Sequence, residues 1–257
     1  MQSHISLIRF YTIVRKEIVR FTRIWPQTLL PPAITMSLYY VIFGNVMGKL
    51  INDFSSYSYI EYIAPGLIMM SVLMNSYNNV VSSFFGAKFG KSLEELIVSP
   101  ASNVSILLGF TIGGMCRGIL VGAMVTVVTL FFTTIHIHSI GLMILVVLLS
   151  SLLFALAGFI NAIFARKFDD ITIVPTFILT PLIYLGGVFY SIELLPTVWQ
   201  SVSLFNPILY IINSFRFGML GISDIDISHA LYMIGLINIL LFGVALYLLN
   251  RGTGTRT

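Results

Sequence analysis

The feature that most constrains this chain is a series of long intervals that contain no charged residue. A helix that crosses the hydrocarbon core of a bilayer needs about 20 mostly apolar residues, and every interval is at least that long. The composition agrees, because only 9% of the residues are charged, whereas a soluble domain needs about a quarter. We therefore expect an all-α membrane protein. The intervals are 24–48, 62–87, 96–116, 118–165, 171–192, 194–215 and 227–250.

Six transmembrane helices are expected from these intervals. The interval 118–165 is about twice a span and has a polar break at 133–141, so it must turn back. With six spans both termini share one side, and that side collects most of the 14 basic residues, which is typical of the cytoplasmic side. The N and C termini are therefore expected in the cytoplasm, with spans near 27–48, 62–86, 105–134, 141–165, 171–190 and 229–250.

The stretch 191–228 is expected to lie outside, between the fifth and sixth spans. It is long enough to cross, but Pro196, Asn206 and Pro207 interrupt it. A seventh span would also move the C-terminal arginines to the external side. We expect two helical pieces, near 194–203 and 207–218, that dip into the outer leaflet and are covered by other helices, because free backbone groups are not tolerated in lipid.

The first 25 residues are predicted to form an amphipathic helix at the cytoplasmic interface. Apolar residues recur at steps of three and four, with cations on another face, as in helices that lie in the headgroup region. A positively charged tail that only sets the topology is the alternative, but it does not explain the apolar stripe. The stripe consists of Tyr11, Val14, Ile18, Phe21 and Trp25.

The cytoplasmic connection 87–103 is predicted to contain a short capped helix. Ser92 and Glu95 have the spacing of a capping box, and Ser99 with Pro100 ends the helix after about two turns. Leu93, Leu96 and Ile97 form a short apolar edge. A capped helix between two spans favours a docking element, and a solvated loop that only holds the topology is the alternative.

The third expected span carries a stripe of small residues and one charge. Gly114, Gly118 and Gly122 recur every fourth residue and allow close approach of a neighbouring helix, either within the chain or across a dimer. Arg117 lies beside them. If the helix ends near Thr134, Arg117 lies about 26 Å from that end, close to the cytoplasmic edge. It is expected either to snorkel to headgroups or to make a structural or gating contact inside the bundle.

Several kinds of chemistry are not supported by the sequence. No expected span contains Asp or Glu, so an ion-coupled mechanism has no evident carboxylate and the energy for uphill transport must come from elsewhere. The segment 86–92 resembles a phosphate-binding loop but has three residues between its glycines instead of four and follows no strand. His136 and His138 are a weak metal signal, and no catalytic arrangement is recognisable. We expect no enzyme, no metal and no nucleic-acid partner.

The order of several motifs resembles ABC-2 type transporter permeases. They are Ala64-Pro65-Gly66-Leu67, the helix from Leu93 to Pro100, Gly186-Gly187-Val188-Phe189, Leu195-Pro196, and Asn206-Pro207-Ile208-Leu209-Tyr210 through Arg216. The resemblance covers essentially the whole chain and implies a single transmembrane domain, 1–257, in a bacterial inner membrane.

The resemblance also implies partners and roles. It implies a homodimer of permeases that pairs with a separately encoded ATP-binding cassette ATPase, which holds the ATP and Mg²⁺, so that this chain carries no cofactor. The cytoplasmic helix would dock on that ATPase, 4–25 would be the connecting helix, and Gly187, Pro196, Asn206, Pro207 and Arg216 would belong to external re-entrant helices. The docking residues would be Ser92, Leu93, Glu94, Glu95, Leu96, Ile97, Val98, Ser99 and Pro100.

Export is implied, with a hydrophobic, amphipathic or lipid-linked substrate, whereas no substrate-binding residue can be named. One alternative is a channel or ion-coupled carrier that works without an ATPase, for which flux through the chain alone would be diagnostic. Another alternative is an intramembrane enzyme, but no residue stands out as catalytic.

Overall fold

The computed structural model describes residues 2–47, 57–98 and 101–253, with side chains over 8–44, 57–96 and 101–253. Within these ranges the chain is helical and contains no β-strand. The elements, in order, are α1 (Gln2–Arg23), α2 (Trp25–Tyr39), the π-helix η1 (Tyr40–Met47), α3 (Tyr59–Phe89), α4 (Ser92–Val98), α5 (Asn103–Thr129), α6 (Ile140–Phe164), α7 (Asp170–Ile173), the π-helix η2 (Val174–Leu179), α8 (Thr180–Leu185), the 3-10 helix η3 (Ile192–Leu194), α9 (Thr197–Leu204), α10 (Pro207–Leu220) and α11 (Ile227–Asn250).

Three described helices are long and apolar enough to cross a membrane, and these are α5, α6 and α11. The helix α3 is longer still but carries polar residues, and it lies at the centre of the bundle against α5, α6 and α10. Its Ser71, Ser76 and Asn79 are buried. Because other helices surround α3, its polar side chains face protein, which explains its lower hydropathy.

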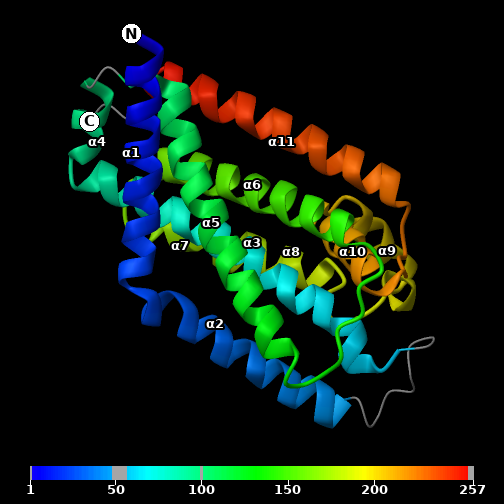
Figure 1. Cartoon of the computed structure of the whole chain (residues 1–257). Helices are drawn as coiled ribbons and strands as arrows, with labels where there is room; N and C mark the ends of the chain where they lie inside the picture. Colours follow the sequence, from blue (N-terminus) through cyan, green and yellow to red (C-terminus); the bar gives the residue numbers. More distant parts are fainter. Residues whose placement is uncertain (1, 48–56, 99–100, 254–257) are drawn as a thin grey trace.

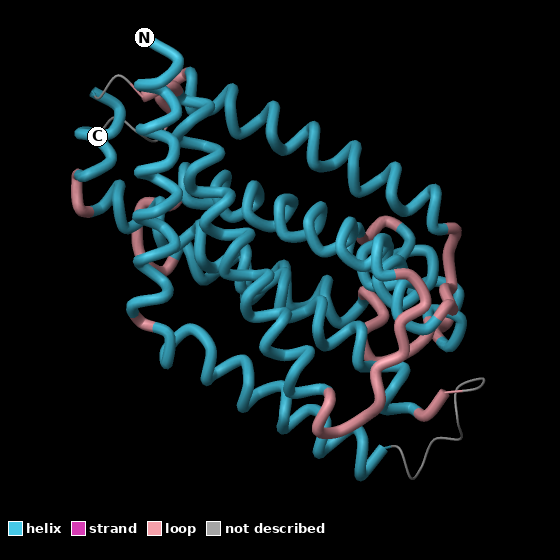
Figure 2. Tube along the Cα trace, viewed as in Figure 1, coloured by secondary structure: helices cyan, strands magenta, loops and turns pink. Residues whose placement is uncertain are grey.

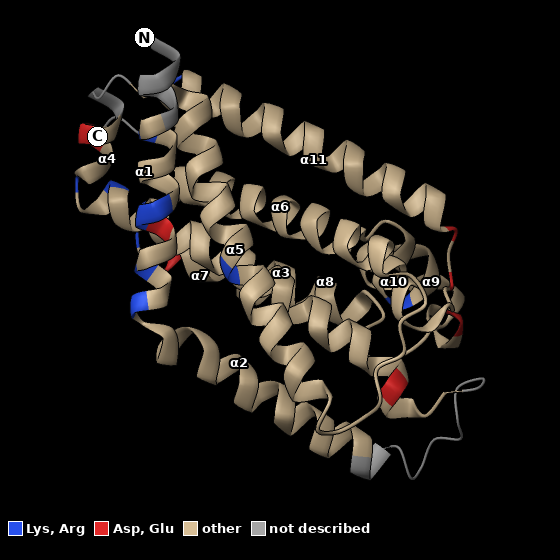
Figure 3. Cartoon of the chain, viewed as in Figure 1, with Lys and Arg blue, Asp and Glu red and all other residues tan. Residues whose placement is uncertain are grey.

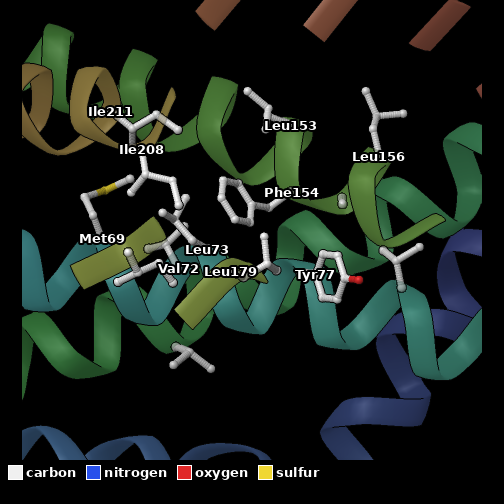
Figure 4. Close-up of a cluster of buried hydrophobic side chains, with 14 of the residues drawn as sticks. Met69, Val72, Leu73, Tyr77, Leu153, Phe154, Leu156, Leu179, Ile208 and Ile211 are labelled. Carbon is white, nitrogen blue, oxygen red and sulfur yellow. The ribbon is translucent and has the colours of Figure 1, made fainter. Parts of the chain in front are cut away.

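One layer of the core lies between α3, α6, η2 and α10. Figure 4 shows Leu73 and Tyr77 of α3 beside Phe154 of α6, with Leu179 and Ile208 closing the same layer. These five side chains are buried. Burial of an aliphatic or aromatic side chain removes its surface from solvent and brings many weak contacts, so this layer fixes α6 and α10 against α3.

The bundle has two different ends. The helix α1 runs across one end, where α4 and the last turn of α11 also lie, while α9 and α10 lie at the other end (Figure 1). The long connection between α5 and α6 is at the α10 end (Figure 2). Most Lys and Arg gather at the α1 end, whereas the charged residues at the α10 end are mostly Asp and Glu (Figure 3). We call these the basic end and the acidic end.

The packed face of α1 differs from the predicted apolar stripe. Of that stripe only Phe21 is buried, whereas Tyr11 is 64% exposed. The face that contacts α5 contains Ile13 and Glu17, which lie against Gly109 and Gly113. The periodicity identified the helix but not this face, because two glycines on a distant helix determine which side of α1 can approach closely.

The segment 171–190, predicted as one span, is helical only to Leu185 and changes its winding. Pro175 and Pro181 lie in or beside the π-helix η2. Proline cannot donate a backbone hydrogen bond, and the Pro175 carbonyl accepts both the Thr180 N–H and, at 2.8 Å, the Thr180 hydroxyl. The resulting apolar helix 170–185 is shorter than the three helices above.

Candidate functional site

The predicted docking helix is present as α4, between α3 and α5 at the basic end. It begins at Ser92 itself, so Ser92 is not the residue before the helix, and its hydroxyl donates to the Ala87 carbonyl at 3.3 Å. The predicted capping box is therefore wrong at its first position. The reason is that α3 continues to Phe89, and Lys91 makes the turn with a left-handed φ of 59°.

The side chains of α4 divide into an anchor and an exposed face. Leu93 is 1% exposed and belongs to the core, so it holds α4 against the bundle and is not part of a free apolar edge. Glu94 and Glu95 are exposed. Ser99 and Pro100 lie outside the described residues, as do the side chains of Ile97 and Val98.

An aromatic cluster lies beside α4. Phe89 and Phe168 are 66% and 55% exposed, and their rings pack on each other and on Phe85, with centroids 4.9 and 5.0 Å apart. Residues far apart in the sequence thus form one surface with α4. A cavity of about 150 Å³ separates this cluster from Lys91 and Arg166.

Two hydrogen-bonded charges hold the α6–α7 turn at this end. The Lys88 amine donates to the carbonyls of Ile163 and Ala165 at 2.9 and 2.8 Å, where α6 ends. Burial, and then the nearby charge of Arg166, lowers the pKa of this amine. The backbone N–H groups of Arg166 and Lys167 donate to Asp170 and lower the pKa of its carboxyl. Asp170 therefore orders the turn.

The glycine stripe of α5 faces α3 of the same chain. A Cβ atom at Gly118 would lie 2.8 Å from the Val72 carbonyl oxygen, and one at Gly114 would lie 2.9 Å from that of Ser76. A Cβ at Gly122 would lie 2.5 Å from the Val72 side chain. The sequence left open whether the stripe packs on a helix of the same chain or across a dimer. In the structure it packs on α3 of the same chain.

Arg117 lies near the middle of α5, beside the stripe. The helix ends at Thr129, so Arg117 is about 18 Å from that end. The sequence predicted an end near Thr134 and therefore a longer distance. Its side chain is half-buried, and its Nε is buried without a hydrogen-bond partner. It lines a cavity of about 450 Å³ between α3, α5 and the α7–η2–α8 segment.

A buried polar network on α1 was missed by the sequence analysis. Glu17 is 0% exposed. Its carboxylate accepts the Ser83 hydroxyl at 2.5 Å and Arg20 Nε at 3.3 Å. Arg20 also donates to the Asn79 carbonyl and side-chain oxygens at 3.1 and 2.8 Å. The only signal in the sequence is one acid within a strongly basic helix, and the network ties α1 to α3.

At the acidic end, Arg216 is fully enclosed. It is 1% exposed. Its guanidinium donates to the Gly187 carbonyl at 2.5 Å and to the Tyr62 carbonyl and Asn213 side-chain oxygen at 3.4 Å. It also lies 4.1 Å from the centroid of the Tyr62 ring, a cation–π geometry. Arg216 therefore joins α10 to α3 and to the turn after α8.

The other predicted residues of this end shape the backbone. Gly187 has a φ of 76°, which favours glycine. The Asn206 side chain caps α10 by accepting the Ile208 N–H at 3.0 Å, and it donates to the Leu182 carbonyl at 2.6 Å. Pro207 is the first residue of α10, and Pro196 precedes α9. Both positions suit proline, which lacks a donor.

These features define a class, a helical membrane protein with a short helix presented at its basic end. The family model of the ABC-2 type transporter matches residues 8–220. The chain belongs to the ABC-2 type transporter family and is a transport permease.

Curated relatives agree with this family. The chain is 48% identical over 254 residues, 99% of both chains, to the inner membrane transport permease YadH of Escherichia coli K12. It is also 22% identical to nodulation protein J of Neorhizobium galegae, over 96% of this chain and 94% of that protein. Nodulation protein J of Rhizobium leguminosarum bv. trifolii is 23% identical, over 81% and 80%. The family implies an ATP-binding cassette ATPase as partner.

Proposed function

We propose that this chain is the membrane-spanning subunit of an ATP-driven exporter, with ATP hydrolysed on a separate ATPase. The observation that carries the proposal is α4, a short helix with exposed Glu94 and Glu95 that Leu93 anchors to the bundle. An anchored helix can transmit a movement of the bound ATPase to α3 and α5, which flank α4 in the chain. A loop without buried contacts would not transmit it. The family and the exposed aromatic pair Phe89 and Phe168 support a docking surface here.

The proposed topology has six spans in one transmembrane domain. They consist of α2 with η1, then α3, α5, α6, the α7–η2–α8 segment and α11, with both termini in the cytoplasm and α9 and α10 re-entrant from outside. The gathering of Lys and Arg at the end with α1 and α4 supports this orientation (Figure 3). The name of the 48% identical relative supports an inner membrane.

The docking surface is tested by reversing its charge. Replacing Glu94 and Glu95 with Lys is expected to release the ATPase in a detergent pull-down and to remove the effect of the chain on ATP hydrolysis. Glu193→Lys, an exposed acid at the acidic end, is the matched control and is expected to retain the ATPase. Equal co-purification of both variants contradicts the docking role of α4.

We also propose a homodimer in which α2 lies at the interface. Leu30, Ile34 and Leu38 of α2 are about half exposed and lie on a single face. In a Cys116→Ser background, which removes the one cysteine, Leu30→Cys is expected to crosslink two chains, whereas Ile239→Cys on α11 is not. A monomer in native mass measurements contradicts the dimer.

The cargo is proposed to be hydrophobic, amphipathic or lipid-linked. The apolar cavity of about 280 Å³ between α3, α5, α6 and α10 supports an apolar contact along the bundle. The alternative function is a channel or an ion-coupled carrier. Gradient-driven flux through the chain alone, without an ATPase, would establish that alternative.

A further inference from the structure

Arg117 is the charged group inside the bundle that the proposed function leaves without a role. Among the described residues, its side chain forms no ion pair and donates no hydrogen bond, although its Nε is buried. A buried N–H group without an acceptor is costly, because it loses its water and gains no partner in return. Such a group is retained where something else supplies the acceptors.

The nearby charges do not neutralise Arg117. Arg20 is the charge that acts on it, and it has the same sign. The only acid beside Arg20 is Glu17, and its carboxylate is already engaged by Arg20 and by the Ser83 hydroxyl. The carboxylate is thus paired with Arg20 alone, and the charge of Arg117 has no opposite charge beside it among the described residues. The excess positive charge lies in a region bounded by apolar helices, where an anion is attracted more strongly than in water.

The cavity beside Arg117 has the shape and chemistry of a headgroup site. It measures about 450 Å³ and lies between α3 and η2, where Thr172 and Thr176 are exposed at its opening. The Asn78 amide lies on the opposite wall, and neither Asn78 nor Thr176 makes a side-chain hydrogen bond to a described residue. Met74 and Ile171 supply apolar surface. A guanidinium, an amide and a hydroxyl are thus available beside an apolar wall.

We propose that this cavity binds the anionic headgroup of an amphipathic molecule, with Arg117 holding a phosphate or carboxylate. Guanidinium donors match the oxygens of both groups and form charge-assisted hydrogen bonds with them. Asn78 and Thr176 donate to the remaining oxygens, and the chain of the amphiphile leaves through the opening between α3 and η2. This deepens the proposed function, on which the role of the occupant as cargo rests.

Binding to the purified full chain without any ATPase tests the site separately from the transport function. Dodecyl phosphate is titrated into protein held in dodecyl maltoside, a neutral amphiphile with the same chain. Arg117→Gln is expected to weaken binding about tenfold or more, as for the loss of a charge-assisted hydrogen bond. Arg23→Gln, which removes an exposed charge on α1, is the matched control and is expected to bind as the unaltered protein does.

A second variant keeps the test valid if Arg117→Gln folds poorly. Thr176→Trp retains Arg117 but fills the opening of the cavity, and it is expected to block the binding of dodecyl phosphate.

Competition experiments distinguish the two possible occupants of the site. Competition by phosphatidylglycerol supports a bilayer lipid as the occupant, and lack of competition supports a single-chain cargo. Equal affinity of Arg117→Gln and unaltered protein overturns the proposal, and so does equal binding of inorganic phosphate and dodecyl phosphate, since the amphiphile would then contribute nothing.

Discussion

The two arginines inside the bundle have opposite surroundings. Arg216, at the acidic end, is enclosed and reaches the acceptors Gly187 O, Tyr62 O and Asn213 Oδ1. Arg117, on α5, has a buried Nε without a partner and faces a cavity. Arg216 thus stabilises the fold through its hydrogen bonds, whereas the Arg117 Nε has no hydrogen-bond partner among the described residues.

This difference shows how the same residue type serves two purposes in a membrane protein. The shortest hydrogen bond of Arg216 goes to the carbonyl of Gly187, which lies in the turn after α8 and outside any helix. Arg117 lies in the middle of the regular helix α5, where backbone carbonyls are engaged by the helix itself. An arginine at such a position takes its acceptors from neighbouring segments or from a ligand, and the described residues supply none to the Arg117 Nε.

The largest expected effect comes from removing Arg216. Arg216→Met removes the guanidinium that donates to the Gly187 carbonyl and stacks on the Tyr62 ring, and it is expected to lower the free energy of unfolding by about 3 kcal/mol or more. Arg117→Met removes an unpaired guanidinium and is expected to leave stability unchanged or to raise it. Thermal unfolding of both variants in the same detergent checks this contrast. Equal losses in the two variants contradict it.

The next effect concerns the wall behind Arg117. Gly118→Ala places a Cβ against the Val72 backbone carbonyl and is expected to cost about 1–3 kcal/mol, as other overpacked sites do. Gly243→Ala on α11 meets nothing within 4 Å and is expected to be neutral or stabilising, because alanine favours helix. Thermal unfolding compares the two variants. A stable Gly118→Ala protein would show that α3 and α5 are not tightly packed.

The smallest effect is a pH dependence at the acidic end, where Glu61 joins the start of α3 to the loop before α6. Burial alone would raise the pKa of its carboxyl, but hydrogen bonds from the Ser58 N–H, the hydroxyls of Thr134 and Ser58, and His136 lower it to about 2. A lowered pKa in the folded state adds stability above about pH 4.5 that is lost as pH falls toward 2. Glu61→Gln is expected to flatten the fall of the unfolding temperature over this range, and an unchanged slope contradicts it.

Much of the helix pattern can be predicted from where charges are missing. The helices α5, α6 and α11 overlap the predicted spans 105–134, 141–165 and 229–250, although α5 begins at Asn103 and ends at Thr129. The helices α9 and α10 could be located because Pro196, Asn206 and Pro207 mark their starts. These are local signals that one stretch of sequence carries by itself.

The surroundings of the two arginines could not be predicted in this way. Glu17 is bonded to Ser83, 66 positions away, and no periodicity on α1 selects that partner. The cavity at Arg117 depends on the path of η2, which changes its winding near Pro175. Contacts between distant segments decide whether a buried charge is satisfied, and they depend on helix crossings that a single sequence does not show.

The most direct test of the central claim, that Arg117 holds a ligand on which an ATP-driven transporter acts, is ligand-stimulated ATP hydrolysis. The chain is reconstituted with its ATPase in liposomes of neutral lipid, and hydrolysis is measured with and without dodecyl phosphate. We predict stimulation in the unaltered protein and in Arg23→Gln, and none in Arg117→Gln. Stimulation of Arg117→Gln equal to that of the unaltered protein, or no stimulation in any of the three, would contradict the claim.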